Sequence, residues 1–161
     1  NLGASGTRWK DLYLSGGAYL GGTGSANKLE DYEEGTWTPT LPSGGSLSVG
    51  KARYVKIGNY VNLSFYVTSI NPTAGNSVFK IGGLPFDVKT DSSYYVGGTI
   101  GYTGDNNLND VMILTGTTLD YLYFHLNDGD GGAVTNTEMR DRGLTGASLD
   151  AMIASVSYTS A

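Results

Sequence analysis

The stretch ARYVKIGNYVNLSFYVT, residues 52–68, carries the clearest structural signal in the chain. Two runs rich in β-branched and aromatic residues flank the dipeptide Gly58-Asn59, which is typical of a two-residue hairpin turn. Side chains alternate between the faces of a strand, so the second run has one apolar face that predicts a core position: Val61, Leu63, Phe65 and Val67. Its other face is amphipathic and suits solvent or a subunit contact: Tyr60, Asn62, Ser64, Tyr66 and Thr68.

Further strand-like runs follow at fairly regular spacing, at residues 78–81, 94–102, 111–114, 119–126 and 149–158. Roughly seven strands with no long helix argue for an all-β fold, an antiparallel β-sandwich or jelly roll. The run 111–114 is continuously apolar, which predicts a strand covered on both faces. Between the last two runs, Thr135 and Glu138 match the capping-box pattern that begins a short helix.

The composition favours strands joined by tight turns, because the chain has 25 Gly and 12 Tyr and only 16% charged residues, where about 25% is usual. The net charge of −5 disfavours nucleic acid as a partner. The absence of Cys excludes a disulfide framework and Cys-ligated zinc. No apolar run is long enough to span a bilayer, so we predict no membrane insertion.

The chain of 161 residues divides into two parts by composition, an extended arm and connector at residues 1–42 and a β head at residues 43–161. Apolar runs at residues 9–14 and 18–20 are separated by glycines. They offer two apolar faces with too little chain to cover both, so the arm either lies on the head or meets copies of itself. We favour the second arrangement. The first residue is Asn1 rather than Met, which favours a piece of a longer polypeptide.

The connector at residues 31–42 is expected to be extended, because Pro39 and Pro42 fix their own φ angles and bias the residues before them. Trp37 is a large apolar anchor in this polar run. It is either a packing anchor for the connector or part of a contact with another subunit.

No catalytic constellation stands out, and we predict no enzyme and no cofactor. The chain has one His, His125, and no Cys. Glu33 and Glu34 are adjacent in an extended segment, so their carboxylates should point in opposite directions. The segment around Asp128 and Asp130 resembles part of a calcium loop but lacks the full pattern, so a turn is preferred and calcium binding there stays open.

Tyrosines on the predicted strands form the best candidate ligand-binding face. Planar amphipathic side chains of this kind can stack on sugar rings. The alternative is that they are ordinary half-buried strand residues, or that their face meets a neighbouring subunit. The candidates are Tyr94, Tyr95, Tyr102, Tyr121, Tyr123 and His125.

Several motifs resemble those of bacteriophage tail fibres and tailspikes. Residues 1–17, NLGASGTRWKDLYLSGG, resemble a recurring segment of these proteins. YLGG at 19–22, ANKL at 26–29 and DYEEGTWTP at 31–39 are similar to the connector that leads into their distal domains. RYVKIGNYV at 53–61 and GLPF at 83–86 fit the hairpin and loop found after it. The resemblance covers roughly the first half of the chain and does not include the residues from Asp91 onward.

The resemblance implies the C-terminal, distal domain of a phage adsorption protein in the virion tail, acting extracellularly at the host surface. Such proteins are typically homotrimers that bind host glycans, such as polysaccharide or lipopolysaccharide, or host proteins. Three copies of the arm would then cover one another's apolar faces. The candidate trimer contacts are Trp9, Leu12, Tyr13, Leu14, Tyr19 and Trp37.

From these observations we predict a trimeric, non-enzymatic receptor-binding tip. One rival is a purely structural trimerisation and capping domain without a ligand. The other is a small glycan hydrolase or esterase, which the lack of a convergent acid–base set disfavours. A monomer would instead favour a stand-alone carbohydrate-binding module. The sequence leaves open the host, the receptor and the presence of an upstream enzymatic domain.

Overall fold

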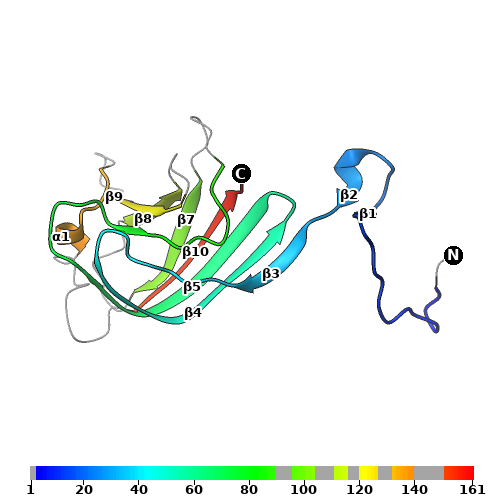
Figure 1. The fold of residues 1–161 in the computed structure, drawn as a ribbon, viewed down its shortest axis with the longest axis horizontal. Helices are drawn as coiled ribbons and strands as arrows, with labels where there is room; N and C mark the ends of the chain where they lie inside the picture. Colours follow the sequence, from blue (N-terminus) through cyan, green and yellow to red (C-terminus); the bar gives the residue numbers. More distant parts are fainter. Residues whose placement is uncertain (1–2, 90–95, 104–110, 116–119, 127–131, 140–150) are drawn as a thin grey trace.

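The computed structural model of the chain describes residues 3–89, 96–103, 111–115, 120–126, 132–139 and 151–161. Its centre is one antiparallel sheet in the order β3-β4-β5-β10-β7-β8-β9-β6. The strands are β3 (Tyr32–Thr36), β4 (Gly45–Ile57), β5 (Tyr60–Pro72), β6 (Lys80–Ile81), β7 (Gly97–Thr103), β8 (Val111–Thr115), β9 (Leu122–Leu126) and β10 (Met152–Thr159). The all-β prediction is confirmed. The two-sheet sandwich or jelly roll remains unconfirmed, because these strands form a single curled sheet (Figure 1).

The predicted hairpin is confirmed, with β4 and β5 joined by Gly58-Asn59 and with Ile57 opposite Tyr60. Gly58 has φ +56° and Asn59 has no positive φ, which fits a type II′ turn with Gly at its first central position. β4 begins at Gly45, seven residues before the run 52–68 that predicts the hairpin. The register shifts between Ser48 and Lys51, so a bulge interrupts the alternation that would have revealed the longer strand.

Strand β10 lies between β5 and β7 and completes the core. The strand predicted within residues 149–158 is confirmed, and its side chains alternate, with Met152, Ala154, Val156 and Tyr158 buried. They meet the apolar face of β5, whose four predicted core residues are at most 3% exposed. Each large apolar side chain buried in this way contributes about 1.5–3 kcal/mol. In β8, Val111 and Ile113 are buried but Leu114 is only half-buried, so the strand is not fully covered on both faces.

A bridge between Thr40 and Gly82 joins the two edges of the curled sheet. Thr40 N donates to Gly82 O and Gly82 N donates to Thr40 O, each at 3.0 Å. These residues follow β3 and β6, the outermost strands. The bridge therefore brings the ends of the sheet together around the enclosed side chains.

The predicted connector contributes to the head. β3 pairs along its length with β4, from Tyr32 opposite Ile57 to Thr36 opposite Arg53. The sheet therefore begins at Tyr32, within the segment that was predicted as a connector. Trp37 is 7% exposed and meets Phe65 edge-on, with ring centroids 5.6 Å apart. It is a packing anchor within its own chain, which leaves little of its ring for the subunit contact that we also considered.

The short helix α1 (Asn136–Met139) begins at the predicted capping box. Thr135 N donates to Glu138 Oε2 at 2.7 Å, and Glu138 N donates to Thr135 Oγ1 at 3.2 Å. These reciprocal bonds satisfy backbone donors that the helix itself leaves free. Met139, at the end of the helix, is fully buried in the core.

Residues 3–30 extend away from the head (Figure 1). They contain β1 (Ala18–Tyr19), the 3-10 turn η1 (Ser25–Asn27) and β2 (Lys28–Leu29), with β1 paired to β2. The apolar residues of this segment are exposed: Trp9, Leu12, Tyr13, Leu14, Tyr19, Leu20 and Leu29. The segment therefore does not lie on the head, which was one of the two predicted arrangements. Its role as a trimerisation arm stays a prediction. Among the described helices, none has the length and apolar character needed to cross a membrane.

Candidate ligand-binding face

The side chains that point away from the core on β3, β4, β5, β10 and β7 form a continuous surface, which we call the outer face. The strand register aligns them in four cross-strand rows. The first two rows are Tyr32–Ile57–Tyr60–Thr159 and Glu34–Val55–Asn62–Ser157. The other two are Thr36–Arg53–Ser64–Ser155–Thr99 and Lys51–Tyr66–Ile153–Tyr102.

Large aromatic and apolar side chains on the outer face are unusually exposed. Each has between 36% and 59% of its surface exposed: Tyr32, Val55, Ile57, Tyr60, Tyr66, Tyr102 and Ile153. A patch of exposed apolar side chains rimmed by polar groups is a common feature of ligand-binding and interaction surfaces. The amphipathic character predicted for the outward side of residues 60–68 is confirmed.

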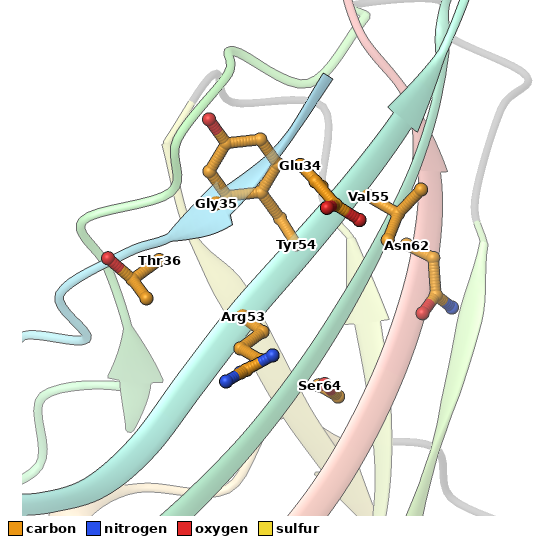
Figure 2. A pocket seen from close by; sticks show the side chains of 8 residues that line it. All are labelled: Glu34, Gly35, Thr36, Arg53, Tyr54, Val55, Asn62 and Ser64. Carbon is orange, nitrogen blue, oxygen red and sulfur yellow. The ribbon is translucent and has the colours of Figure 1, made fainter. Parts of the chain in front are cut away.

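A first hollow of about 380 Å³ opens on the outer face. Figure 2 shows the residues that line it, which come from three adjacent strands: Glu34, Gly35 and Thr36 on β3, Arg53, Tyr54 and Val55 on β4, and Asn62 and Ser64 on β5. Asn62 Nδ2 donates to Ser157 Oγ at 2.8 Å, and Tyr32 Oη donates to Glu34 Oε2 at 2.9 Å. These bonds fix polar side chains at the hollow before any ligand arrives.

Gly35 is required at the edge of this hollow. A Cβ atom there would lie 2.8 Å from the ring of Tyr54. Tyr54 packs edge-on against Phe86, with ring centroids 5.2 Å apart, and its hydroxyl donates to Glu33. That hydrogen bond is the main cause of the raised pKa of Tyr54. Glu33 and Glu34 thus bond to tyrosines on opposite faces of the sheet, as their adjacency in a strand predicts.

A second hollow of about 310 Å³ adjoins the first. Both are lined by Arg53 and Ser64, and the second adds Lys51, Phe65, Tyr66 and Ile153. The ring of Tyr66 lies over Gly50, where a Cβ atom would come within 2.7 Å of it. Together the two hollows form one groove across β3, β4, β5 and β10, which we call the outer-face groove.

The predicted tyrosine face is divided in the structure. Lys80 Nζ lies 4.7 Å from the ring centroid of Tyr121 and 5.8 Å from that of Tyr123, so these two rings share one cation. His125 lies two residues further along β9, on the same side as Tyr123. All three side chains are half-buried, and they remain a candidate ligand site.

Tyr102 is not part of this cluster. Gly97 on β7 is opposite Leu114, which is opposite Tyr123, so the three share a row. Tyr102 lies five residues further along β7, which corresponds to about 16 Å along the strand. It borders Ile153 on the outer face instead. The other predicted positions, Tyr94, Tyr95, Asp128 and Asp130, lie outside the described residues.

The residues that the sequence reasoning missed are Lys51 and Arg53, and no ligand role was assigned to Asn62 or Ser64. The sequence does contain a signal for these two cations, because residues two positions apart on one strand share a face of the sheet. The bulge near Gly50 concealed Lys51 from the pattern. Within the described ranges, no three acidic, His or Cys side chains gather in a way that could hold a metal ion.

Comparison of the chain with protein-family models, with curated proteins and with solved structures finds no significant match.

Proposed function

We propose that this chain is the receptor-binding tip of a phage tail fibre or tailspike, and that it attaches the virion to host-surface glycans. In this proposal three copies are joined through residues 3–30, and each presents an all-β head of the sandwich or jelly-roll type. The outer-face groove is the contact surface of each head. The motif resemblance in the first half of the chain supports the tail-fibre origin.

The observation that carries the binding role is the composition of the outer-face groove. Tyr66 offers a flat, exposed ring at one end, while Asn62 and Ser64 offer an amide and a hydroxyl beside it. Sugars bind to such combinations through stacking of their C–H faces and hydrogen bonds to their hydroxyls. The groove is shallow and open, so it suits an extended polysaccharide better than a small buried substrate.

The exposed N-terminal segment supports the trimer. Trp9, Leu12 and Tyr13 are 67%, 64% and 92% exposed, and a single chain leaves their apolar surface in water. Burying that surface between copies would stabilise an assembly by about 25 cal/mol per Å². Three linked heads would also raise avidity by about 10²–10⁴ over a single weak site when the receptor spacing permits.

The test is binding of the labelled chain to an array of bacterial surface glycans and to bacterial cells. We expect binding that is lost in the double variant Asn62→Ala, Tyr66→Ala and kept in the double variant Tyr121→Ala, Tyr123→Ala. Circular dichroism of each variant checks that the fold is intact. Loss in the second variant alone would move the ligand to the predicted tyrosine face.

The alternative is a structural trimerisation and capping domain. The exposed apolar residues Ile57 and Ile153 favour it, because they also suit a contact between heads. A trimer that binds no glycan and no cell would support this alternative and contradict the receptor-binding role.

A further inference from the structure

Two cations in the outer-face groove are not paired with any carboxylate of the described chain. Lys51 and Arg53 lie two residues apart on β4, so both side chains point to the outer face. Both are exposed, and neither takes part in the ion pairs found among the described residues. They are adjacent positive charges in a chain with a net charge of −5.

Most other described cations have a partner. Lys56 is paired with Asp31, Lys28 with Glu30, and Lys10 lies 4.0 Å from Asp11. Lys80 lies over two tyrosine rings. Carboxylates are abundant in this acidic chain, yet none of the described ones pairs with Lys51 or Arg53. These two positive charges are therefore available to an external anion.

The groove has a distinct chemical order along its length. At one end Lys51, Arg53 and Tyr66 place two positive charges next to an aromatic ring. The Ser64 hydroxyl lies in the same cross-strand row as Arg53, and the Asn62 amide lies in the next row, which it shares with Glu34. At the other end Glu34 places a carboxylate, already bonded to Tyr32, where it can accept hydrogen bonds but repels an anion.

This order matches one class of ligand. The planar Arg guanidinium donates two parallel hydrogen bonds to a carboxylate or phosphate, and Lys adds a second positive charge. Tyr66 can stack on the sugar ring that carries the anionic group. A neutral sugar residue attached to it would extend toward Asn62 and Glu34, which hydrogen-bond hydroxyls.

We propose that the outer-face groove selects an acidic oligosaccharide, with its carboxylate or phosphate group bound by Lys51 and Arg53 and its neutral residues directed toward Glu34. This inference rests on the proposed glycan-binding function and narrows its ligand to anionic glycans. The shared chemistry is a sugar-borne oxyanion, and its two sources, uronic acids and sugar phosphates, are separated in the experiment.

The experiment uses matched pairs of bacterial oligosaccharides on one array. Uronate-containing oligosaccharides are paired with their carboxyl-reduced forms, and phosphorylated ones with their dephosphorylated forms. We expect the intact chain to bind acidic members and to lose binding to their neutral counterparts. Binding of the uronate-containing oligosaccharide identifies a carboxylate as the recognised group, and binding of the phosphorylated oligosaccharide identifies a phosphate.

Substitutions then assign the cations. Arg53→Gln should weaken binding of the acidic glycan about tenfold or more, because it removes a charge-assisted hydrogen bond. Lys51→Gln should weaken it less, since Lys contributes a point charge. Lys89→Gln removes the charge of an exposed cation that lines neither hollow, so it is the matched control and should leave binding unchanged.

A second measurement does not depend on any variant. Raising the ionic strength from about 0.01 M to about 1 M shortens the screening length from about 30 Å to about 3 Å, so affinity for the acidic glycan should fall steeply. Equal binding of acidic and neutral members, or binding insensitive to salt and to Arg53→Gln, would overturn the inference while leaving glycan binding intact. Binding to no glycan at all would instead contradict the proposed function itself.

Discussion

Tyr158 illustrates how one side chain stabilises the centre of the head. It is 1% exposed, and its hydroxyl donates to Phe86 O at 2.8 Å. This bond connects β10, in the middle of the sheet, to the loop after β6. Burial of the phenol disfavours its charged form and therefore raises the pKa of Tyr158 above its ordinary value.

Substitution of Tyr158 by Phe should lower the free energy of unfolding by about 1–2 kcal/mol, because the buried Phe86 carbonyl loses its donor. Above pH 10, the ordinary pKa of tyrosine, the unfolded chain releases this proton while the folded chain retains it. The unfolding free energy of the unsubstituted protein should therefore fall with rising pH in that range. Urea denaturation between neutral and alkaline pH measures both effects. Equal alkaline slopes for the two proteins would show that Tyr158 does not titrate in this way.

At the residue scale, the sequence predicted side-chain direction better than side-chain role. The core positions of β5 followed from alternation, because one face of a half-buried strand must be apolar. The place of Trp37 did not follow, since a Trp beside prolines fits a packing anchor and a subunit contact equally well. Only its distance to Phe65 decides between them.

The turn of the β4–β5 hairpin has different backbone conformations at its two central residues. Gly58 has φ +56°, a conformation that is strained for other residues. Asn59 has no positive φ, and its carbonyl accepts a hydrogen bond from Ser160 N at 2.7 Å. The two turn positions should therefore respond very differently to the same substitution.

Gly58→Ala should destabilise the protein by about 1–3 kcal/mol, because the added Cβ strains a positive-φ position. Asn59→Ala is the matched control, and its effect should stay within about 0.5 kcal/mol, since the backbone bond is kept. Thermal or urea denaturation of both variants measures the difference. Equal effects at the two positions would contradict the type II′ assignment.

At the element scale, strand existence was predictable and strand order was not. Turn residues and alternation mark β4, β5, β9 and β10 in the sequence. No local pattern places β10 between β5 and β7, because sheet order depends on contacts between residues far apart in the chain. β3 was taken for a connector for the same reason, since its pairing with β4 is visible only in three dimensions.

At the scale of the whole molecule, the head and the N-terminal segment differ in how far their apolar residues are buried. The buried core lies within residues 37–158, whereas the large apolar residues of the segment are exposed. The head should therefore fold without the segment, while the segment depends on other copies under the proposed function.

Removal of residues 1–29 should change the mass in solution from a trimer to a monomer and leave the β-sheet circular dichroism signal of the head unchanged. This truncation keeps Glu30 O, which accepts from Gly58 N at 3.2 Å. Light scattering of the full chain and the truncated chain measures the masses. A full chain that is already monomeric would contradict the trimer and favour a stand-alone carbohydrate-binding module.

The candidate site was only partly predictable from sequence. The outward face of residues 60–68 was predicted to suit solvent or a subunit contact, and the ligand groups of the groove come from strands whose register the sequence does not reveal. The groove forms only when Glu34, Arg53 and Ser64 are brought side by side by that register. The tyrosines of the sequence predicted a ligand site that includes β9, but there Lys80 already lies over the rings of Tyr121 and Tyr123.

The central place of β10 has a consequence for biosynthesis. β5 and β7 are joined to each other through a strand that the ribosome makes after every other strand of the sheet. The nascent chain therefore cannot close its hydrophobic core until residues 152–159 have emerged. Such high contact order predicts slow folding, in milliseconds to seconds, once residues 152–159 have emerged. During that interval the apolar faces of β5 and β7 are open to aggregation, so cellular yield should depend strongly on chaperone capacity.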